Sequence, residues 1–223
     1  MTQAVRTKSQ VLFERFCTQH GLGCTAIPVE HTRTADYRVI VQGHEIVAEV
    51  KQLDPNAQDR ASSRALKSGG IGKYGGEAGS RIRHMIDKGK EQVANLARDR
   101  SPGLLVIYNN VPECPTYTDP MFVMIAMYGH LTLELELSSS VAGPPKAKAL
   151  RHGAKNKMSP CSNTSLSAVC VLQERDDGQL LLTCYHNRFA AIPFDAEWLR
   201  VPEVRHFGHP PGSGRFVKEW TEL

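Results

Sequence analysis

The sequence predicts an α/β fold built on a mixed central sheet. Two segments carry apolar residues at helical spacing, short β-branched runs lie between them, and a continuous apolar run follows the second segment. We interpret these segments, in chain order, as a helix, three strands, a helix and a strand, over residues 9–20, 24–30, 36–41, 44–52, 80–97 and 103–108. A later helix and a β-hairpin are expected to extend this αβββαβ core.

The first predicted helix begins at Ser9 and ends before Gly21. Leu12, Phe13 and Phe16 give this segment a broad apolar face, and a glycine commonly follows the last turn of a helix. The core is therefore expected to begin with an amphipathic helix that packs against the sheet.

The two strands of a predicted hairpin carry the charged residues that bear most on function. The short Gln42–Gly43 turn joins these strands in an antiparallel pair, with Asp36 at the end of one and Glu49 and Lys51 on the other. Because side chains alternate across a strand, Glu49 and Lys51 share a face and lie about 7 Å apart. The pairing brings Asp36 near both of them.

Two carboxylates and an ammonium at neighbouring strand ends suit a divalent metal beside a phosphodiester. Mg²⁺ prefers oxygen ligands and is commonly held by one or two carboxylates together with phosphate oxygens. We therefore expect Asp36 and Glu49 to bind Mg²⁺, and Lys51 to orient water or offset phosphate charge. The alternative is a solvated ion pair between Glu49 and Lys51 on an edge strand, which would stabilise the fold little.

Asp36 followed by Glu49-Val50-Lys51 resembles the motif of the PD-(D/E)xK nuclease superfamily, which has a restriction-endonuclease-like fold. The likeness spans residues 5–110, and Ala35 stands where the motif name has proline. It implies a Mg²⁺-dependent phosphodiesterase, either an endonuclease or an exonuclease, in which Mn²⁺ can replace Mg²⁺. The implied substrate is nucleic acid, with DNA favoured over RNA.

The resemblance also implies an acidic metal ligand on the first helix, and Glu14 matches it. A merely exposed helical glutamate is the other interpretation. Gln52, directly after the motif, is expected to touch water or substrate. The predicted catalytic residues are Asp36, Glu49, Lys51 and Gln52, and the predicted metal ligands are Asp36, Glu49 and Glu14.

The segment from residue 54 to residue 79 is polar and rich in glycine, with no clear period, so we expect a loop. It is not a convincing P-loop, because Lys67 stands in place of the first glycine and Tyr74 replaces the Ser or Thr that binds Mg²⁺. No nucleotide cofactor is expected. Arg60, Arg64, Lys67 and Lys73 instead favour a mobile loop that clamps the substrate, with a plain linker as the alternative.

The helix predicted from Ser80 carries a polar stripe beside its apolar face. Arg81, His84 and Lys88 are expected to contact nucleic acid, and Gln92 is expected to approach the site. The alternative is an ordinary solvated helix face.

Residues 138–166 are rich in Ser, Pro, Gly and Ala and include no acidic residue, which predicts a flexible basic loop. The chain has a net charge of +4, so the five cations of this segment account for its basic character. They are expected to contact a polyanion, and a merely solubilising loop is the alternative. These cations are Lys146, Lys148, Arg151, Lys155 and Lys157.

Further elements are expected beyond the core. Asp119-Pro120 is typical of a helix start, and an apolar segment follows it. The predicted elements are a helix over 121–128, a strand over 131–137 and a hairpin with strands over 167–173 and 180–186.

Several function classes lose support from the sequence. The six cysteines form no Cys-x-x-Cys pair, which favours free thiols in a reducing cytoplasm. No apolar run is long enough to cross a membrane, so no membrane partner is expected. Cys184, His186, His206 and His209 lack zinc-site spacing, and no zinc is expected. A Gly-x-Ser-x-Gly elbow is absent.

We expect one nuclease-like domain over residues 1–223, with its core at 5–137, the basic loop at 138–166 and a β extension at 167–223. The expected function is cleavage of nucleic acid by a cytoplasmic hydrolase, and a homo-oligomer is allowed. A noncatalytic nucleic-acid-binding module on the same fold is the first alternative. A protein-interaction scaffold is the second.

Overall fold

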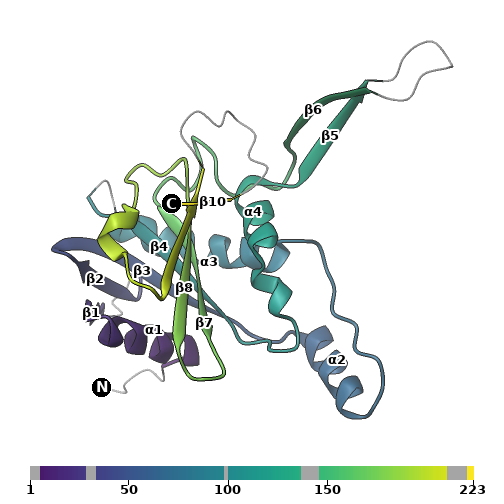
Figure 1. The fold of residues 1–223 in the computed structure, drawn as a ribbon, viewed down its shortest axis with the longest axis horizontal. Helices are drawn as coiled ribbons and strands as arrows, with labels where there is room; N and C mark the ends of the chain where they lie inside the picture. The colour runs from purple at the N-terminus through teal and green to yellow at the C-terminus, as the bar shows by residue number, and fades with distance from the viewer. Residues whose placement is uncertain (1–5, 29–33, 98–99, 137–145, 210–219) are drawn as a thin grey trace.

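The chain folds into helices packed on both faces of a mixed sheet (Figure 1). The computed structural model describes residues 6–28, 34–97, 100–136, 146–209 and 220–223. The helices are α1 (Lys8–Gln19), α2 (Ala57–Lys67), α3 (Ser80–Ala97) and α4 (Pro120–Tyr128), with short 3-10 helices η1 (Pro115–Thr118) and η2 (Ala196–Leu199). The strands are β1 (Gly23–Ala26), β2 (Tyr37–Val41), β3 (His44–Leu53), β4 (Gly103–Asn109), β5 (Leu131–Glu136), β6 (Lys146–His152), β7 (Ala168–Glu174), β8 (Leu180–His186), β9 (Val204–Gly208) and β10 (Thr221–Glu222).

Eight of the described strands form one sheet in the order β1-β2-β3-β4-β7-β8-β9-β10. The first three strands are antiparallel, whereas β3, β4 and β7 run parallel to one another. Gln42 and Gly43 connect β2 to β3 with positive φ angles of 49° and 83°, as two-residue hairpin turns commonly require. The predicted hairpin is confirmed, and β3 lies inside the sheet between β2 and β4.

Two apolar layers cover the sheet. On one face, Leu12 and Phe16 of α1 belong to a buried cluster with Val50 of β3. On the other face, Ile86 of α3 belongs to a cluster with Leu105 of β4, which α4 and η1 complete. Because side chains alternate along a strand, the face of β3 opposite Val50 is turned toward α3. This arrangement decides where the charged residues of β3 lie.

The predicted helices have clear boundaries in the structure. Thr7 and Gln10 form a capping box that starts α1, one residue before the predicted start. The Asp119 side chain accepts a hydrogen bond from Met121 N at 2.8 Å, and Gly129 ends α4 with a φ of 96°. The prediction of a helix started by Asp119-Pro120 is therefore confirmed.

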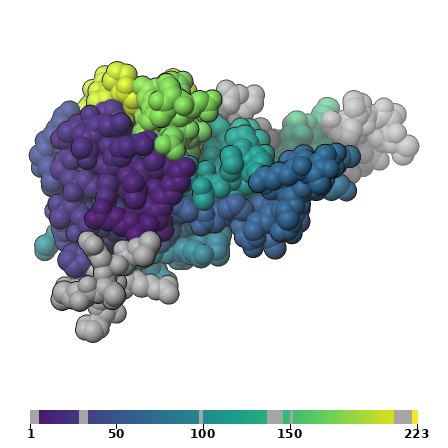
Figure 2. Space-filling model, turned by 90° about the horizontal axis from the view of Figure 1, so that it is seen from below, coloured from purple at the N-terminus to yellow at the C-terminus, as the bar shows by residue number. Residues whose placement is uncertain are grey.

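The prediction of a loop throughout residues 54–79 is wrong, because α2 occupies much of this segment. Asn56 and Asp59 form a capping box at its start. The residues that α2 buries are polar, namely Asp59 and Ser62, so the helix has no apolar period that the sequence could reveal. In Figures 1 and 2, α2 extends away from the body of the sheet.

The prediction of a flexible basic loop over 138–166 is also wrong for the residues that the structure describes there. Residues 146–152 form β6, which pairs with β5 in a separate two-stranded hairpin. Farther along, Met158 and Leu166 are fully buried. Lys146 to Ala149 alternate lysine with alanine, a strand period that the overall composition hides. Residues 137–145 lie outside the described part.

The C-terminal region adds more to the sheet than the predicted hairpin. β7 and β8 form that hairpin, and β9 and β10 continue the sheet beyond it. The predicted end of the first strand, after Pro28, falls outside the described residues.

All six cysteines are free thiols. Among the described residues, no helix has both the length and the apolar character needed to cross a membrane.

Candidate active site

Asp36 and Glu49 face each other across the β2–β3 hairpin. Tyr37 pairs with Ala48, so Asp36 lies opposite Glu49 one step beyond that pair. Asp36 Oδ2 accepts a hydrogen bond of 2.8 Å from the backbone N–H of Val50. The turn register and this backbone contact together hold the first carboxylate beside the second.

A second contact orients Asp36 from the side of α1. Gln10 Nε2 donates a hydrogen bond of 3.1 Å to Asp36 Oδ1. Gln10 is itself fixed as part of the capping box at the start of α1. Both oxygens of Asp36 therefore have donors, and each can still accept a further partner because a carboxylate oxygen has two lone pairs.

Glu49 is fully buried beneath α3. Gly89 of α3 lies above it, and a Cβ at that position would be 3.4 Å from Glu49 Cγ and 2.7 Å from Leu105 Cδ1. Glycine therefore allows α3 to approach the sheet at this point. The alternative of a solvated ion pair on an edge strand is excluded, because β3 is an interior strand and Glu49 has no exposed surface.

Lys51 extends from the same face of β3 and contacts both Glu49 and α3. Its Nζ forms an ion pair with Glu49 Oε1 and donates a hydrogen bond of 2.9 Å to Gln92 Oε1. Gln92 Nε2 in turn donates to the carbonyl of Thr34 at 3.2 Å. Gln92 lies beside the site, as predicted, and links Lys51 to the segment that leads into Asp36.

The environment of Glu49 disfavours its charged form. Burial and the nearby charge of Asp36 raise the pKa of Glu49 to about 7, although the ion pair with Lys51 acts in the opposite direction. Within the described part of the chain, Glu49 Oε2 is buried without any hydrogen-bond partner. A buried carboxylate oxygen without a donor is costly, and a cation would satisfy it.

The residues present therefore fit a hard divalent cation. Asp36 and Glu49 offer the oxygen ligands that Mg²⁺ prefers. The described residues include no group of three or more His, Cys, Asp and Glu side chains close enough to hold a metal. Water and substrate phosphate oxygens would have to complete the coordination, which is usual for Mg²⁺.

Glu14 makes other contacts than those predicted. Its carboxylate accepts hydrogen bonds from Arg6 at 2.6 Å and from the Tyr37 hydroxyl at 2.8 Å. Tyr37 belongs to the layer that packs on α1, whereas Glu49 faces α3. Among the described residues, the structure does not group Glu14 with Asp36 and Glu49, and the contacts of Glu14 join α1 to β2.

Gln52 also lies on the α1 side of the sheet, because it follows Lys51 by one residue. Its Oε1 accepts a hydrogen bond of 3.0 Å from Ser9 N, and its Nε2 donates to Asp54 Oδ1 at 2.7 Å. The structure thus places Gln52, predicted as a catalytic residue, on the face of β3 opposite Glu49 and Lys51. Its amide holds the first turn of α1 against β3.

Three of the predicted nucleic-acid contacts are taken up within the protein. Arg81 forms an ion pair of 2.8 Å with the buried Asp59. The charge of Arg81 is therefore shared with a carboxylate of the protein, and its contact with nucleic acid stays a prediction. Lys155 and Lys157 form ion pairs of 2.7 Å and 2.6 Å with Glu77 and Asp87, and these pairs tie their segment to α3 and to the residues that precede it.

The other predicted contacts lie on the surface. His84 and Lys88 are exposed on α3, the helix that supplies Gln92. Lys73 is exposed before that helix, and Lys146 and Lys148 are exposed on the β5–β6 hairpin. The sixth residue, Arg151, belongs to β6, and its side chain lies outside the described part.

The structure adds positioning residues that the sequence did not single out, namely Gln10, Thr34 and Gly89. The one sequence signal for them was a glycine inside an otherwise amphipathic helix, which often marks close packing.

No protein-family model, curated protein or solved structure matches the chain. The geometry itself offers two carboxylates and an ammonium at one point, which is chemistry suited to a metal-bound phosphoryl group.

Proposed function

We propose that this chain is a metal-dependent nuclease of the PD-(D/E)xK type, which hydrolyses phosphodiester bonds in nucleic acid, DNA in preference to RNA. The observation that carries the proposal is the buried Glu49, which lies opposite Asp36 and is paired with Lys51. The order α1, β1, β2, β3, α3 and β4 supports a restriction-endonuclease-like core, with α2 as an insertion.

Each residue of the site has a defined part in this proposal. Asp36 and Glu49 hold Mg²⁺, or Mn²⁺ in its place. When bound, the metal polarises the phosphate and lowers the pKa of coordinated water. Lys51 directs its ammonium toward the same point and stabilises the negative charge that develops on the phosphate. Gln92 fixes the position of that ammonium through its 2.9 Å hydrogen bond.

The surrounding elements keep these groups in place during the reaction. Gln10 and the backbone of Val50 orient Asp36. The close approach of α3 at Gly89 excludes water from the buried side of Glu49. Ionic groups in such a shielded place interact more strongly than in bulk water.

The test is cleavage by wild type and by Asp36→Asn, Glu49→Gln and Lys51→Met. Linear, circular and single-stranded DNA and RNA would be incubated with Mg²⁺, with Mn²⁺ or with a chelator. We expect each variant to lose at least about a hundredfold in rate, because each removes a charge from the transition state. Glu14→Gln is the matched carboxylate control and should cleave like wild type.

Two outcomes would overturn the proposal. Equal cleavage by all the variants would remove the site assignment. Binding of nucleic acid that survives chelation, with no polymer ever cut, would instead favour a noncatalytic binding module.

A further inference from the structure

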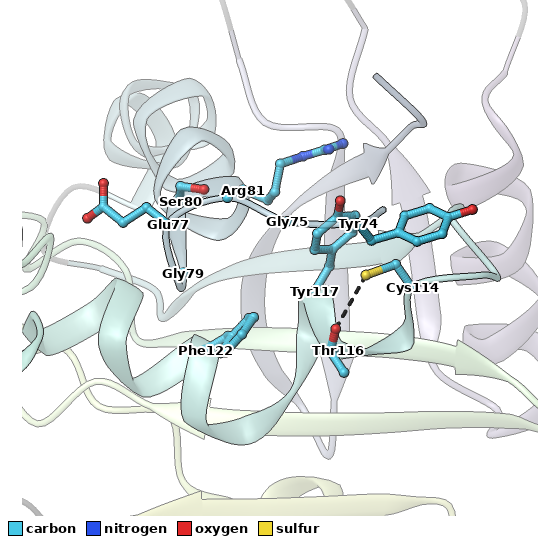
Figure 3. Close-up of a pocket in the computed structure, with 11 residues that line it drawn as sticks. Tyr74, Gly75, Glu77, Gly79, Ser80, Arg81, Cys114, Thr116, Tyr117 and Phe122 are labelled. Atoms are coloured by element: carbon cyan, nitrogen blue, oxygen red, sulfur yellow. Dashed lines mark hydrogen bonds between the residues drawn. The ribbon is translucent and has the colours of Figure 1, made fainter. Parts of the chain in front are cut away.

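A cavity lies between the start of α3, η1 and the start of α4 (Figure 3). Its volume is about 130 Å³, which is room for several water molecules or one flat ring. Tyr74, Tyr117 and Phe122 contribute aromatic side chains to its walls. Cys114 and Thr116 line it as well, with a contact of 3.3 Å between their side chains.

The ring of Tyr117, which forms the buried wall of this cavity, is held in place by contacts on its far side. The Tyr117 hydroxyl donates a hydrogen bond of 2.6 Å to Asp59, and the Arg81 guanidinium lies 4.9 Å from the centre of the Tyr117 ring. Tyr117 itself is almost fully buried, whereas Tyr74 and Phe122 are only partly buried. The last two rings therefore keep surface that a ligand can cover.

The rim of the cavity is made of backbone with little side-chain bulk. Gly75, Gly76 and Gly79 all line it. At Gly79, which has a φ of 72°, an added Cβ would lie 2.8 Å from the carbonyl oxygen of Phe122. Glycine is required there, because a side chain would clash with the backbone of α4.

A cationic groove adjoins the cavity on the side of α2. Its volume is about 350 Å³, and Arg60, Arg64 and Lys67 line it from one face of the helix. Glu113 also lines the groove, with Oε1 accepting a hydrogen bond of 2.8 Å from Ser63. Asp59 lines it too, but its charge is paired with Arg81. The remaining excess of positive charge suits a polyanion.

The groove and the cavity belong to one structural unit. Pro112 and Glu113 line the groove, and the next residue along the chain, Cys114, lines the cavity. The cavity lies at the start of α3, and Arg81, which lines it, precedes Gln92 on this helix by 11 residues, which corresponds to about 16 Å. This length is the span of a few nucleotides.

We infer that the cavity holds one unpaired base of the nucleic-acid substrate, while the α2 groove holds the phosphates beside it. Stacking on aromatic rings next to a cationic track is the usual way in which proteins bind single strands. A base inside a duplex cannot enter such a cavity without leaving the stack. The inference rests on the proposed nuclease function and narrows its substrate to nucleic acid with a single-stranded segment a few nucleotides from the cleaved bond.

Binding in the presence of a chelator tests the inference without cleavage. The probes are a fluorescein-labelled single strand, the same strand as a duplex, and strands with one abasic site at successive positions. With the wild-type protein, we expect the single strand to bind more tightly than the duplex. Removing the base at one position should weaken binding about tenfold, and removal elsewhere should have little effect.

Variants of the protein test the aromatic cavity and the α2 groove separately. Tyr74→Ala should lose about tenfold in single-strand affinity, and Tyr74→Phe should retain it, because the ring provides the stacking. Arg64→Gln should weaken every probe and lower the salt slope by about one. Arg200→Gln removes an exposed arginine directly after η2, which lines neither the cavity nor the groove, and should change neither quantity.

The abasic series uses the wild-type protein, so it does not depend on the folding of any variant. If all the abasic strands bind like the intact strand, the base subsite is refuted, even if wild type cleaves with Mg²⁺. If one position matters but no polymer is cut, the subsite stands and the nuclease function fails. Absence of binding to any probe would refute the subsite, and cleavage with Mg²⁺ would then decide the nuclease function by itself.

Discussion

The ammonium of Lys51 donates a hydrogen bond of 2.9 Å to the amide oxygen of Gln92. The two residues come from different layers of the fold, since Lys51 belongs to the interior strand β3 and Gln92 to the helix that covers it. Because Nζ also pairs with Glu49, the lysine is held from two directions. The position of its charge is therefore a property of the packing between α3 and the sheet.

Replacing Gln92 with leucine should lower the turnover of the proposed reaction about tenfold and leave KM nearly unchanged. The substitution removes an acceptor from Lys51 but no group that contacts substrate, so ground-state binding should persist. Steady-state kinetics on a cleavable oligonucleotide would measure both constants. Glu91→Gln, at an exposed position on the same helix, is the control. A rise in KM with normal turnover would contradict the positioning role.

Replacing Gly89 with valine should destabilise the protein by about 1–3 kcal/mol, as overpacking of a full interior commonly does. The new Cβ would lie 2.7 Å from Leu105 Cδ1, in a place where Leu105 is fully buried. Urea unfolding would measure the change. Ala94→Val, at a half-buried position on the same helix, should cost less. Equal losses at the two positions would argue against close packing over Glu49.

Replacing Glu49 with glutamine should stabilise the metal-free protein at pH 8. The folded pKa of about 7 exceeds the ordinary value of 4.5, so the native state loses stability as pH rises through this range and the buried carboxyl ionises. Glutamine removes that cost, and the gain should be on the order of 1–3 kcal/mol. Glu14→Gln is the matched control. Chemical unfolding in a chelator would reveal the difference, and a less stable Glu49→Gln protein would count against it.

Replacing His186 with glutamine should reduce the loss of stability in mild acid. Burial and, next, His206, whose Nδ1 lies 2.9 Å from His186 Nε2, together lower the pKa of His186 to about 4, although the backbone of Phe194 and the charge of Asp195 act in the opposite direction. A histidine with a depressed pKa contributes stability above its unfolded pKa of about 6.5, and this contribution is lost as pH falls toward 4.

The difference between the wild-type and His186→Gln slopes should reach at most about 1.4 kcal/mol per pH unit in that window. Unfolding free energies at several pH values between neutral and acidic conditions would give both slopes. His84→Gln, on the exposed side of α3, should follow wild type. Parallel curves for wild type and His186→Gln would show that His186 titrates normally.

The hairpin that carries the candidate site could be predicted from the sequence because three local rules agree there. The strand period places Glu49 and Lys51 on one face, the short turn sets the pairing, and the pairing brings Asp36 across. What the sequence could not supply was the side of the sheet on which each helix packs. The resemblance suggested Glu14, and its place after the motif suggested Gln52, but Glu14 belongs to α1 and Gln52 contacts the start of that helix, on the face of the sheet opposite Glu49.

The sequence did not predict α2 and β6, and the physical reason is different. α2 buries Asp59 and Ser62, so its inner face is held by hydrogen bonds and an ion pair and has no apolar stripe. β6 is a strand of a hairpin outside the main sheet, and its lysines face solvent. Apolar periodicity reveals an element only where the element is buried by apolar contacts.

The two-residue connection at Gln42 and Gly43 has a consequence at the other end of the hairpin. The turn sets the register between β2 and β3. That register places Asp36 opposite Glu49 at the other end of the hairpin. One inserted residue there would slide the partners past each other and turn a different side chain toward Glu49. The exposed turn at Gln42 and Gly43 therefore determines how the two carboxylates of the candidate site are placed. This turn tolerates less change in length than its exposure suggests.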